Sequence, residues 1–354
     1  MRIFTIVGTS VAEVSALPST PVAGGYVWVA CARGEFDAQQ AQLQAALPQL
    51  GGAPMVDLHL QDLLNPQLPS RYDYTSQYDL LVFRRLATGQ SPASPSVPTK
   101  RSGPPILRRI NTDPVGFAVF DQVLLTVHPD DCSVRDMYAE RLQTSGGRVP
   151  TSPADLMLRI VNQMVDGYLD LRRELSRQLD HWQTALLQPG TRFTHWSALL
   201  DTRLTLHRLD DVCEEQRAAL QDWIEAVKTW PEASSPAAAR ERELLQVRSR
   251  DVLEHIERVV RHVQRLEQNM ETTVQMHFSV QSNRTNDIMR TLTVLTAIFL
   301  PLNLMAGIFG MNFDFIPLLH QQSGFWWTLG AMALIAVAMG LVFWRKQYLR
   351  RTGG

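Results

Sequence analysis

Two long runs of apolar residues lie near the C-terminal end of the chain, in contrast to the mixed pattern that precedes them. The first run covers residues 292–309 and the second covers residues 325–344. Each run is close to the ~20 residues that span the hydrocarbon core of a bilayer as a helix. We therefore expect two membrane-spanning helices joined by a short loop, with the lipid bilayer as a partner of this chain.

The N-terminal part, residues 1–150, has short apolar stretches separated by turn residues. These stretches are β-branched or aromatic, and they predict the strands of a domain that also contains helices. We therefore expect an α/β domain in this region. The expected strands are Arg2 to Val7, Tyr26 to Ala32, Asp79 to Phe83 and Val123 to Val127.

From Ser152 onward, apolar residues recur at steps of three and four, which is the pattern of amphipathic helices. Two helices are expected over Pro153 to Leu187 and Trp196 to Trp230. A third begins near Ala237 and meets no proline before Pro301. Because nothing interrupts it, we expect a stalk helix of roughly sixty residues or more that runs into the membrane.

These patterns predict an α+β cytoplasmic domain joined to a long α-helical stalk and a two-helix transmembrane hairpin. The expected segments are the α/β domain at 1–150, the helical region with the stalk at 151–290, the first transmembrane helix at 291–312, an external loop at 313–324, the second transmembrane helix at 325–344 and a basic tail at 345–354.

Composition excludes several classes of protein. The chain has 34 basic and 35 acidic residues, so no net positive field attracts nucleic acid. The three cysteines are far apart and form no CxxC pair, which argues against a thiolate metal site and against a disulfide framework. The sequence contains no GxxxxGK[ST], GxGxxG, GxSxG or HExxH motif. We therefore expect neither a nucleotide site of these kinds nor an enzyme.

Charged residues around the two apolar runs predict their orientation. Arg284 and Arg290 precede the first run, Arg345 and Lys346 follow the second, and the loop between them has no Lys or Arg. Because positive flanking residues stay on the cytoplasmic side, both termini should face the cytoplasm. The N-terminal apolar stretch is too short for a secretory signal. A multi-pass protein of the cell inner membrane is expected.

One face of the long helix near the membrane has a mixed composition. Hydroxyl, amide, thioether and leucine side chains and glycines follow one another at steps of three and four, which places them in one stripe. Polar groups at membrane depth face protein or water, so the stripe is either a pore lining or a helix-packing face. Both interpretations remain open from the residues alone. The stripe consists of Ser282, Asn286, Met289, Leu292, Thr296, Leu300, Asn303, Gly307 and Gly310.

The segment from Ser282 to Pro317 reads SNRTNDIMRTLTVLTAIFLPLNLMAGIFGMNFDFIP. It carries Gly310, Met311 and Asn312 after an apolar run, and it resembles the Gly-Met-Asn signature of the CorA family of magnesium channels and transporters, within the 2-TM-GxN superfamily. The resemblance implies a funnel-shaped homopentamer, a pore lined by the first membrane helix, and Mg²⁺ as both the transported and the regulatory ion, with Co²⁺ and Ni²⁺ as further cargo. Weaker resemblance covers Arg250 to His255, Leu58 to Pro69 and Leu124 to His128.

A ring of neutral amides suits this ion. Mg²⁺ gives up its water reluctantly, so stripping it at a pore entrance is costly. The amide oxygen of Asn312 can accept hydrogen bonds from the waters of a hydrated ion, which makes Gly310, Met311 and Asn312 the expected selectivity filter. Met311 is expected to pack the ring in place. Asn303 would offer a second amide ring deeper in the pore.

Apolar rings below the entrance are expected to act as a gate. Leu300, Leu292 and Met289 lie on the stripe, and a ring of such side chains can close to a hydrated ion by dewetting when it narrows. The membrane potential, worth ~2.3 kcal/mol per charge per 100 mV, is the expected driving force.

The resemblance also implies a regulatory site. Asp251 matches a family position that binds intracellular Mg²⁺ between neighbouring domains and holds the channel closed, although it can equally be a solvated helix charge beside Arg250. Asp73 and Asp79 are candidate partners. After the filter, Asp314 is the acid left to attract cations, because Leu318 stands where the family usually has a glutamate.

Three alternatives remain in view. A zinc transporter similar to ZntB would usually carry Gly-Ile-Asn, and His255 and His262 are seven residues apart with no HxxxH pair. A membrane-anchored enzyme lacks a motif to support it. A structural coiled-coil protein would explain the long helix, but neither the polar stripe nor Asn312.

Overall fold

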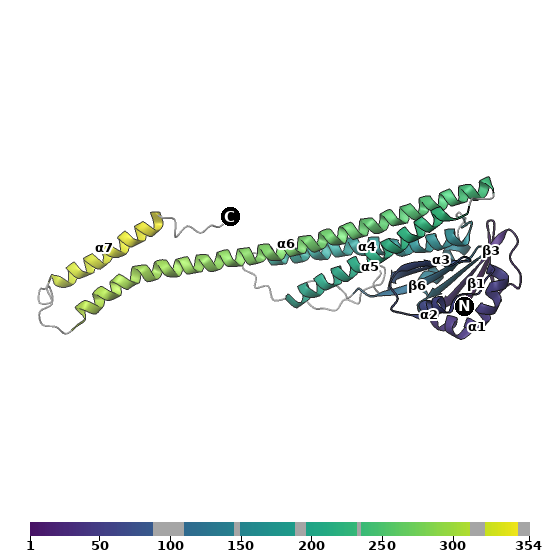
Figure 1. Cartoon of the computed structure of the whole chain (residues 1–354). Coiled ribbons are helices and arrows are strands. Elements are labelled where there is room, and N and C mark those ends of the chain that lie inside the picture. The colour runs from purple at the N-terminus through teal and green to yellow at the C-terminus, as the bar shows by residue number, and fades with distance from the viewer. Residues whose placement is uncertain (88–109, 145–148, 188–195, 232–234, 312–322, 346–354) are drawn as a thin grey trace. The chain divides into compact units, whose positions relative to one another are not determined.

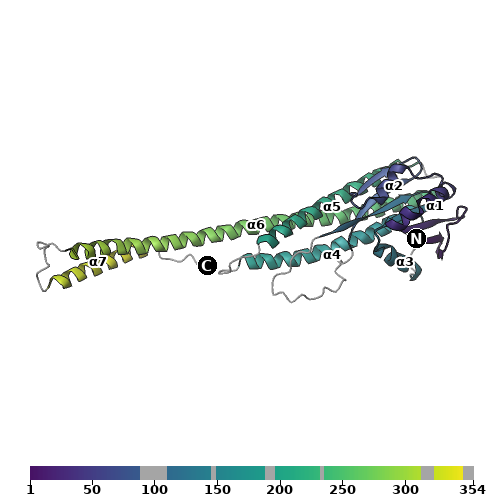
Figure 2. The ribbon, with the colours of Figure 1, turned by 90° about the horizontal axis from the view of Figure 1, so that it is seen from below.

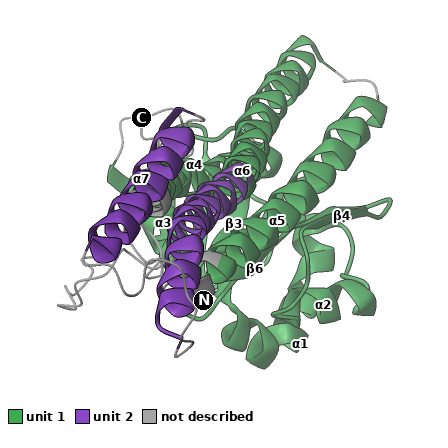
Figure 3. Ribbon diagram, turned by 90° about the vertical axis from the view of Figure 1, so that its left-hand side faces the viewer, with its two compact units in different colours: residues 1–271 green, residues 272–354 purple. Residues whose placement is uncertain are grey.

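The computed structural model describes residues 1–87, 110–144, 149–187, 196–231, 235–311 and 323–345. The chain divides into two compact units, Met1–Glu271 and Thr272–Gly354, which are coloured separately in Figure 3. Asn312, Asp314 and Leu318 lie outside the described residues, as do most of the expected loop and the expected basic tail after Arg345.

Unit 1 is built on a mixed seven-stranded sheet with the order β2-β1-β3-β7-β6-β5-β4. Neighbouring strands are antiparallel except β3 and β7, which are parallel. The strands are β1 (Arg2–Val7), β2 (Ser10–Val14), β3 (Gly25–Ala32), β4 (Arg71–Tyr74), β5 (Asp79–Leu86), β6 (Thr112–Val119) and β7 (Val123–His128).

Along the central strands, side chains point alternately to the two faces of the sheet, and helices cover both faces. Val27 and Val29 of β3 belong to a core that also contains residues of α1 (Arg33–Gly51) and α2 (Asp57–Leu64). Trp28 points to the other face, where its ring meets the edge of Tyr138 from α3 (Ser133–Thr144). The helices α4 (Pro153–Leu187) and α5 (Trp196–Thr229) also contact the sheet (Figures 1 and 2). The sheet is therefore sandwiched between helices.

The helices of unit 1 are connected to one another by polar as well as apolar contacts. Trp223 of α5 donates to Ser249 of α6 (Pro236–Phe309) at 3.1 Å, and Ser176 of α4 lies 2.7 Å from the Nε2 atom of His262. The buried positions of α6 in this unit follow the three-and-four spacing of a helix-packing face. They are Leu245, Ser249, Val252, Ile256, Val259, Val260, Val263, Leu266 and Met270.

Unit 2 contains the end of α6 together with α7 (Gly324–Arg345), which lie side by side in Figures 1 and 2. The helix α6 is a single helix of 74 residues, as the absence of proline before Pro301 predicts. In unit 1, α4 begins at Pro153 and α5 begins at Trp196, which are the starts that the apolar periodicity predicts. The four expected strands are confirmed as β1, β3, β5 and β7.

Three further strands, β2, β4 and β6, were not expected from the sequence. The strand β6 contains Pro114, which removes a backbone donor, and Gly116, which weakens a strand. The glycine has a packing reason, because a Cβ atom there would overlap Leu63 of α2. Close packing of a helix on the sheet therefore overrides the local sequence signal.

Candidate functional site

Two described helices, α6 and α7, are long and apolar enough to cross a membrane. The apolar window of α6 is 6% buried, and that of α7 is 0% buried. Large side chains such as Phe325, Trp327 and Leu334 are exposed along α7. Contiguous apolar surface of this kind marks a protein or membrane interaction site, so these helices need lipid or further protein around them.

The membrane part of α6 has one partly covered face, and α7 is the described element beside it (Figure 1). On α7 the less exposed positions also form one face, which includes Met332 and Phe343. This arrangement fits an antiparallel pair of helices within unit 2. On α6 the buried or half-buried positions include Val294, Ile298, Pro301, Met305 and Phe309.

The stripe expected to line a pore occupies the opposite side of α6. Leu292, Thr296, Asn303 and Gly307 each lie two residues from one of these covered positions, which is about 200° around a helix of 3.6 residues per turn. Every member of the stripe is exposed. Among the residues that the structure describes, this face of the helix is therefore left exposed. The exposed positions are Ser282, Asn286, Met289, Leu292, Thr296, Leu300, Asn303, Gly307 and Gly310.

The polar side chains on this face differ in whether they have a hydrogen-bond partner among the described residues. The hydroxyl of Thr296 donates to the carbonyl of Leu292 at 2.9 Å, which removes its need for another acceptor. Within the described part of the chain, the amides of Asn286 and Asn303 make no hydrogen bond. Asn303 lies within the apolar run, where an unpaired amide is costly, so its side chain needs water or another copy of the helix.

The end of α6 is held by backbone hydrogen bonds. The N–H of Gly310 donates to Ala306 at 2.9 Å, and that of Met311 donates to Ile308 at 3.2 Å. A Cβ atom at Gly307 would meet nothing within 4 Å, so no packing contact among the described residues requires a glycine there. Close approach of a second helix is a physical reason for such a glycine. Asn312 follows directly, outside the described residues.

Asp251 lies on α6 in unit 1, and its side chain is 64% exposed. The Nε2 atom of His255, one turn further along, is 3.9 Å from its carboxylate. Burial raises the pKa of Asp166 on α4, whereas the nearby charge of His255 lowers it. Sequence reasoning missed Asp166, because no spacing along the chain relates α4 to α6. In the described residues, no group of three or more His, Cys, Asp or Glu side chains is arranged to hold a metal.

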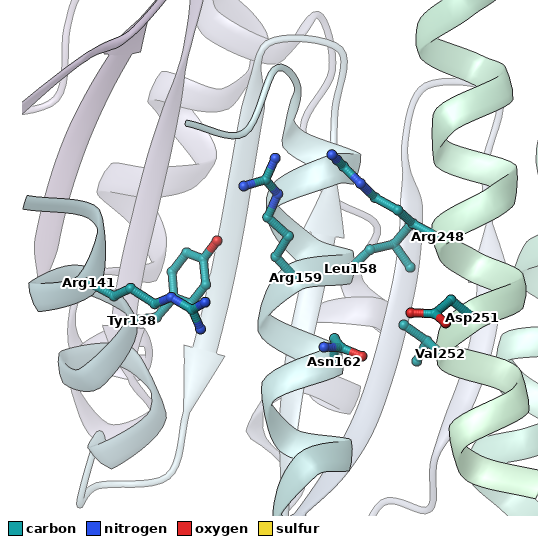
Figure 4. Close-up of a pocket in the computed structure, with 8 residues that line it drawn as sticks. All are labelled: Tyr138, Arg141, Leu158, Arg159, Asn162, Arg248, Asp251 and Val252. Atoms are coloured by element: carbon teal, nitrogen blue, oxygen red, sulfur yellow. The ribbon is translucent and has the colours of Figure 1, made fainter. Parts of the chain in front are cut away.

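Three arginines line the cavity beside Asp251. This cavity has a volume of about 260 Å³, and α3, α4 and α6 contribute side chains to it (Figure 4). Asp73 and Asp79, the two candidate partners, do not line this cavity. They line another one, of about 1040 Å³, at the end of the sheet. The residues around Asp251 are Tyr138, Arg141, Leu158, Arg159, Asn162, Arg248 and Val252.

Asp73 and Asp79 are engaged within their own part of the fold. Asp73 lies 3.2 Å from Arg71 and 3.3 Å from the Nε2 atom of His59. Its pKa is lowered by a hydrogen bond from the backbone of Tyr74 and by His59, against the effect of burial. Burial raises the pKa of Asp79, although a hydrogen bond from Tyr72 works in the other direction. In a single chain, therefore, neither acid meets Asp251.

A family model described as "CorA-like Mg2+ transporter protein" matches residues 34–347. The chain is 24% identical to the cobalt/magnesium transport protein CorA of Thermotoga maritima, over 82% of this chain and 76% of that protein. It is 25% identical to the magnesium transport protein CorA of Escherichia coli K12, over 66% of this chain and 71% of that protein.

The fold has a solved counterpart. The complete structure of the CorA magnesium transporter from Methanocaldococcus jannaschii matches with a TM-score of 0.73 and 18% sequence identity. The match covers 100% of this chain and 98% of the other. The arrangement of a mixed sheet, a long helix and a C-terminal apolar helix is therefore that of a known full-length structure.

Proposed function

Because the chain belongs to the CorA family, whose model covers residues 34–347, we propose that it is a channel for Mg²⁺ uptake. As a member of that family it transports divalent cations across a membrane. The observation that carries the proposal is the exposed face of α6, which bears polar and small residues opposite the side next to α7. A face of this kind is suited to water and ions.

Assembly follows from the number of helices. A subunit with two membrane helices cannot enclose a pore, so copies of α6 must surround an axis. We propose a homopentamer with α6 inside and α7 outside, both termini in the cytoplasm and the inner membrane as its location. The open space at Gly307 supports close packing of neighbouring copies. A native mass measurement in lipid that gave a monomer or dimer would contradict this assembly.

The proposed filter is the ring of Asn312 amides, with Gly310 and Met311 beside it and Asn303 as a second ring. Hydrated Mg²⁺ would be held through its waters, without the tight grip of a carboxylate. Asp314 would concentrate cations at the entrance. The membrane potential would drive a divalent ion with ~4.6 kcal/mol per 100 mV, twice the value for one charge.

The experiment is Mg²⁺ flux into proteoliposomes for wild type and for Asn312→Ala, with Zn²⁺, Co²⁺ and Ni²⁺ in parallel. The variant should assemble normally but lose Mg²⁺ flux by about a hundredfold or more, because an alanine ring offers no acceptor to the water shell. Asn312→Asp, which keeps the shape and adds charge, should bind divalents more tightly and pass them more slowly. Mg²⁺ flux at the wild-type rate in Asn312→Ala would exclude the filter. Wild-type flux of Zn²⁺ with a proton gradient and none of Mg²⁺ would favour the ZntB-like alternative.

Regulation is the second part of the proposal. Leu300, Leu292 and Met289 would form the apolar rings that close, and Mg²⁺ bound at Asp251 between subunits would hold them closed. The exposure of Asp251 leaves its carboxylate available to a neighbour. Asp251→Lys should then raise the Mg²⁺ concentration needed to protect the protein from proteolysis, roughly tenfold for a loss of ~1.4 kcal/mol. Protection at the wild-type concentration would leave Asp251 as a surface charge.

A further inference from the structure

The cavity of about 1040 Å³ at the end of the sheet is lined by acidic and aromatic side chains. Small-molecule sites usually have ~300–1,000 Å³, so this cavity is large enough for an organic ligand and far larger than a single ion. Among the described residues, Arg242 is the only basic residue of the lining, and its guanidinium donates to backbone carbonyls that follow α5. The acidic residues of the lining are Asp73, Asp79, Asp121, Asp222, Glu225 and Glu241.

Most of these carboxylates have no basic partner. Asp73 is paired with Arg71 at 3.2 Å, and Glu225 is paired with Lys228 at 2.6 Å. Among the described residues, no base pairs with the other four acids. The cavity therefore has a negative charge that the chain itself does not neutralise. The four acids without a base are Asp79, Asp121, Asp222 and Glu241.

Two of these four acids lie at the same end of the sheet. Asp79 begins β5 and pairs with Val119 of β6, and Asp121 follows two residues after Val119. Burial raises the pKa of Asp79, a hydrogen bond from Tyr72 lowers it, and the charge of Asp121 raises it again. Two neighbouring carboxylates without a base repel each other, and a cation placed at them removes the repulsion.

Glu241, on α6, gives a separate indication of a missing partner. Its Oε1 atom is buried and has no hydrogen-bond partner among the described residues. A buried polar atom without a partner costs free energy, and a ligand that pairs with it recovers that cost. An ionised carboxylate only accepts hydrogen bonds, so the missing partner is a donor, and an ammonium group offers three N–H donors.

Aromatic rings form another part of the lining. The rings of Tyr72 and Tyr74 are stacked, with their centroids 6.1 Å apart, and Tyr74 is 69% exposed. Trp230 lines the same cavity. The face of an aromatic ring attracts an ammonium group, and its apolar surface packs against methylene groups. The lining therefore suits a ligand that combines positive charge with an aliphatic chain.

We propose that this cavity binds a linear polyamine. Its ammonium groups would donate to the free carboxylates, and its methylene chain would lie against the tyrosine rings. Separated charges fit this lining better than one metal ion does. The free acids come from the sheet, α5 and α6, and no group of three or more His, Cys, Asp or Glu side chains in the described residues is arranged to hold a metal. A bound polyamine would link the start of α6 to the end of the sheet.

Isothermal titration calorimetry of spermine into the full chain in zwitterionic nanodiscs tests this, with saturating Mg²⁺ present throughout to occupy sites that prefer a metal. Wild type should bind spermine, and propylamine should bind at least about a hundredfold more weakly, because one ammonium group replaces several. Asp222→Asn should weaken spermine binding about tenfold, the usual effect of one charge-assisted hydrogen bond. Tyr74→Leu should weaken it about threefold through the lost ring face. Both side chains are exposed, so the fold should tolerate the changes.

The matched control is Asp201→Asn, because Asp201 is also an exposed acid on α5 but does not line the cavity. It should leave spermine affinity unchanged. No spermine binding, equal losses in Asp201→Asn and Asp222→Asn, or full affinity in Tyr74→Leu would each overturn the proposal. Tighter binding of an oligolysine peptide than of spermine would also overturn it, in favour of a basic peptide. Binding requires no flux, so its failure is distinct from a failure of the transport proposal.

Discussion

The two units of the chain treat the same kinds of residue in opposite ways. In unit 1, Trp28 and Leu81 are 0% exposed, whereas in unit 2 Leu300 is 69% exposed and Trp327 is 71% exposed. Burial from water stabilises the first unit, because each buried leucine or larger side chain contributes on the order of 1.5–3 kcal/mol. The second unit buries little within one chain. Its apolar surface therefore requires lipid and further copies of itself.

The largest expected effect separates the two units. A fragment of residues 1–271 should fold and remain soluble without detergent, because the sheet and its helices bury their apolar residues within unit 1. The full chain should require detergent or lipid. Size-exclusion chromatography and circular dichroism of both proteins measure this. A fragment that aggregates without detergent would show that unit 1 depends on unit 2.

A matched pair of leucines sharpens the comparison. Leu81→Ala in β5 should reduce the free energy of unfolding by ~2–5 kcal/mol, since it leaves a cavity in a packed core. Leu300→Ala should change it by less than ~0.5 kcal/mol, because its side chain is exposed in the chain. Urea unfolding of the full chain in detergent, followed by tryptophan fluorescence, compares the two.

In the proteoliposome assay of Mg²⁺ flux, Leu300→Ala should have the larger effect and Leu81→Ala the smaller one. Leu300→Ala should leak Mg²⁺ when internal Mg²⁺ is high, while Leu81→Ala, once folded, should not. Equal unfolding losses in the two variants would show that the exposed face of α6 is packed in the assembly as tightly as a core.

A smaller effect is the loss of folding stability at acid pH, which we expect in unit 1. His128 is 0% exposed, and burial together with the nearby Arg135 and Arg85 lowers its pKa to about 3. The unfolded chain, with a pKa of ~6.5, takes up the proton first as the pH falls. Stability contributed by neutral His128 is therefore complete above pH ~6.5 and is lost as the pH falls towards 3, by at most ~1.4 kcal/mol per pH unit.

His128→Gln should remove this part of the acid slope, while retaining an amide that can reach Thr126, the present partner of the Nε2 atom at 2.9 Å. Urea midpoints of the 1–271 fragment between pH 7 and pH 4 measure the slope. His207→Gln, a change at an exposed position on α5, is the control and should behave as wild type. The same slope in wild type and His128→Gln would show that other groups cause the acid loss.

Long periodic segments could be predicted from the sequence, and short interrupted ones could not. The start of α4 at Pro153 and the continuous α6 follow from helical periodicity, which accumulates over many residues. The strand β2 has the sequence SVAEV and is largely exposed at the edge of the sheet, so it lacks a buried face to reveal it. The fold of the family was predicted from the segment around Gly310 and is confirmed by the full-length structural match.

One part of the candidate site could be predicted from the sequence, and another part could not. The stripe that contains Asn303 and Gly307 could be found because it lies on one helix, and its exposure agrees with a pore lining that remains a prediction. The cavity beside Asp251 could not be found, because Arg141 and Arg159 reach it from helices separated along the chain from α6. Sequence spacing reports neighbours within an element, whereas tertiary packing decides which elements share a cavity.

The parallel pairing of β3 with β7 also affects how the chain folds during synthesis. Val27 pairs with Val123, roughly a hundred residues later, so the sheet cannot close until β7 has left the ribosome. The first apolar run, at residue 292, follows about 160 residues after that, and synthesis at ~5–20 residues per second makes this an interval of about 8–30 s. Since mixed sheets of this size usually close faster than that, the sheet is complete before the insertion machinery meets the first membrane segment.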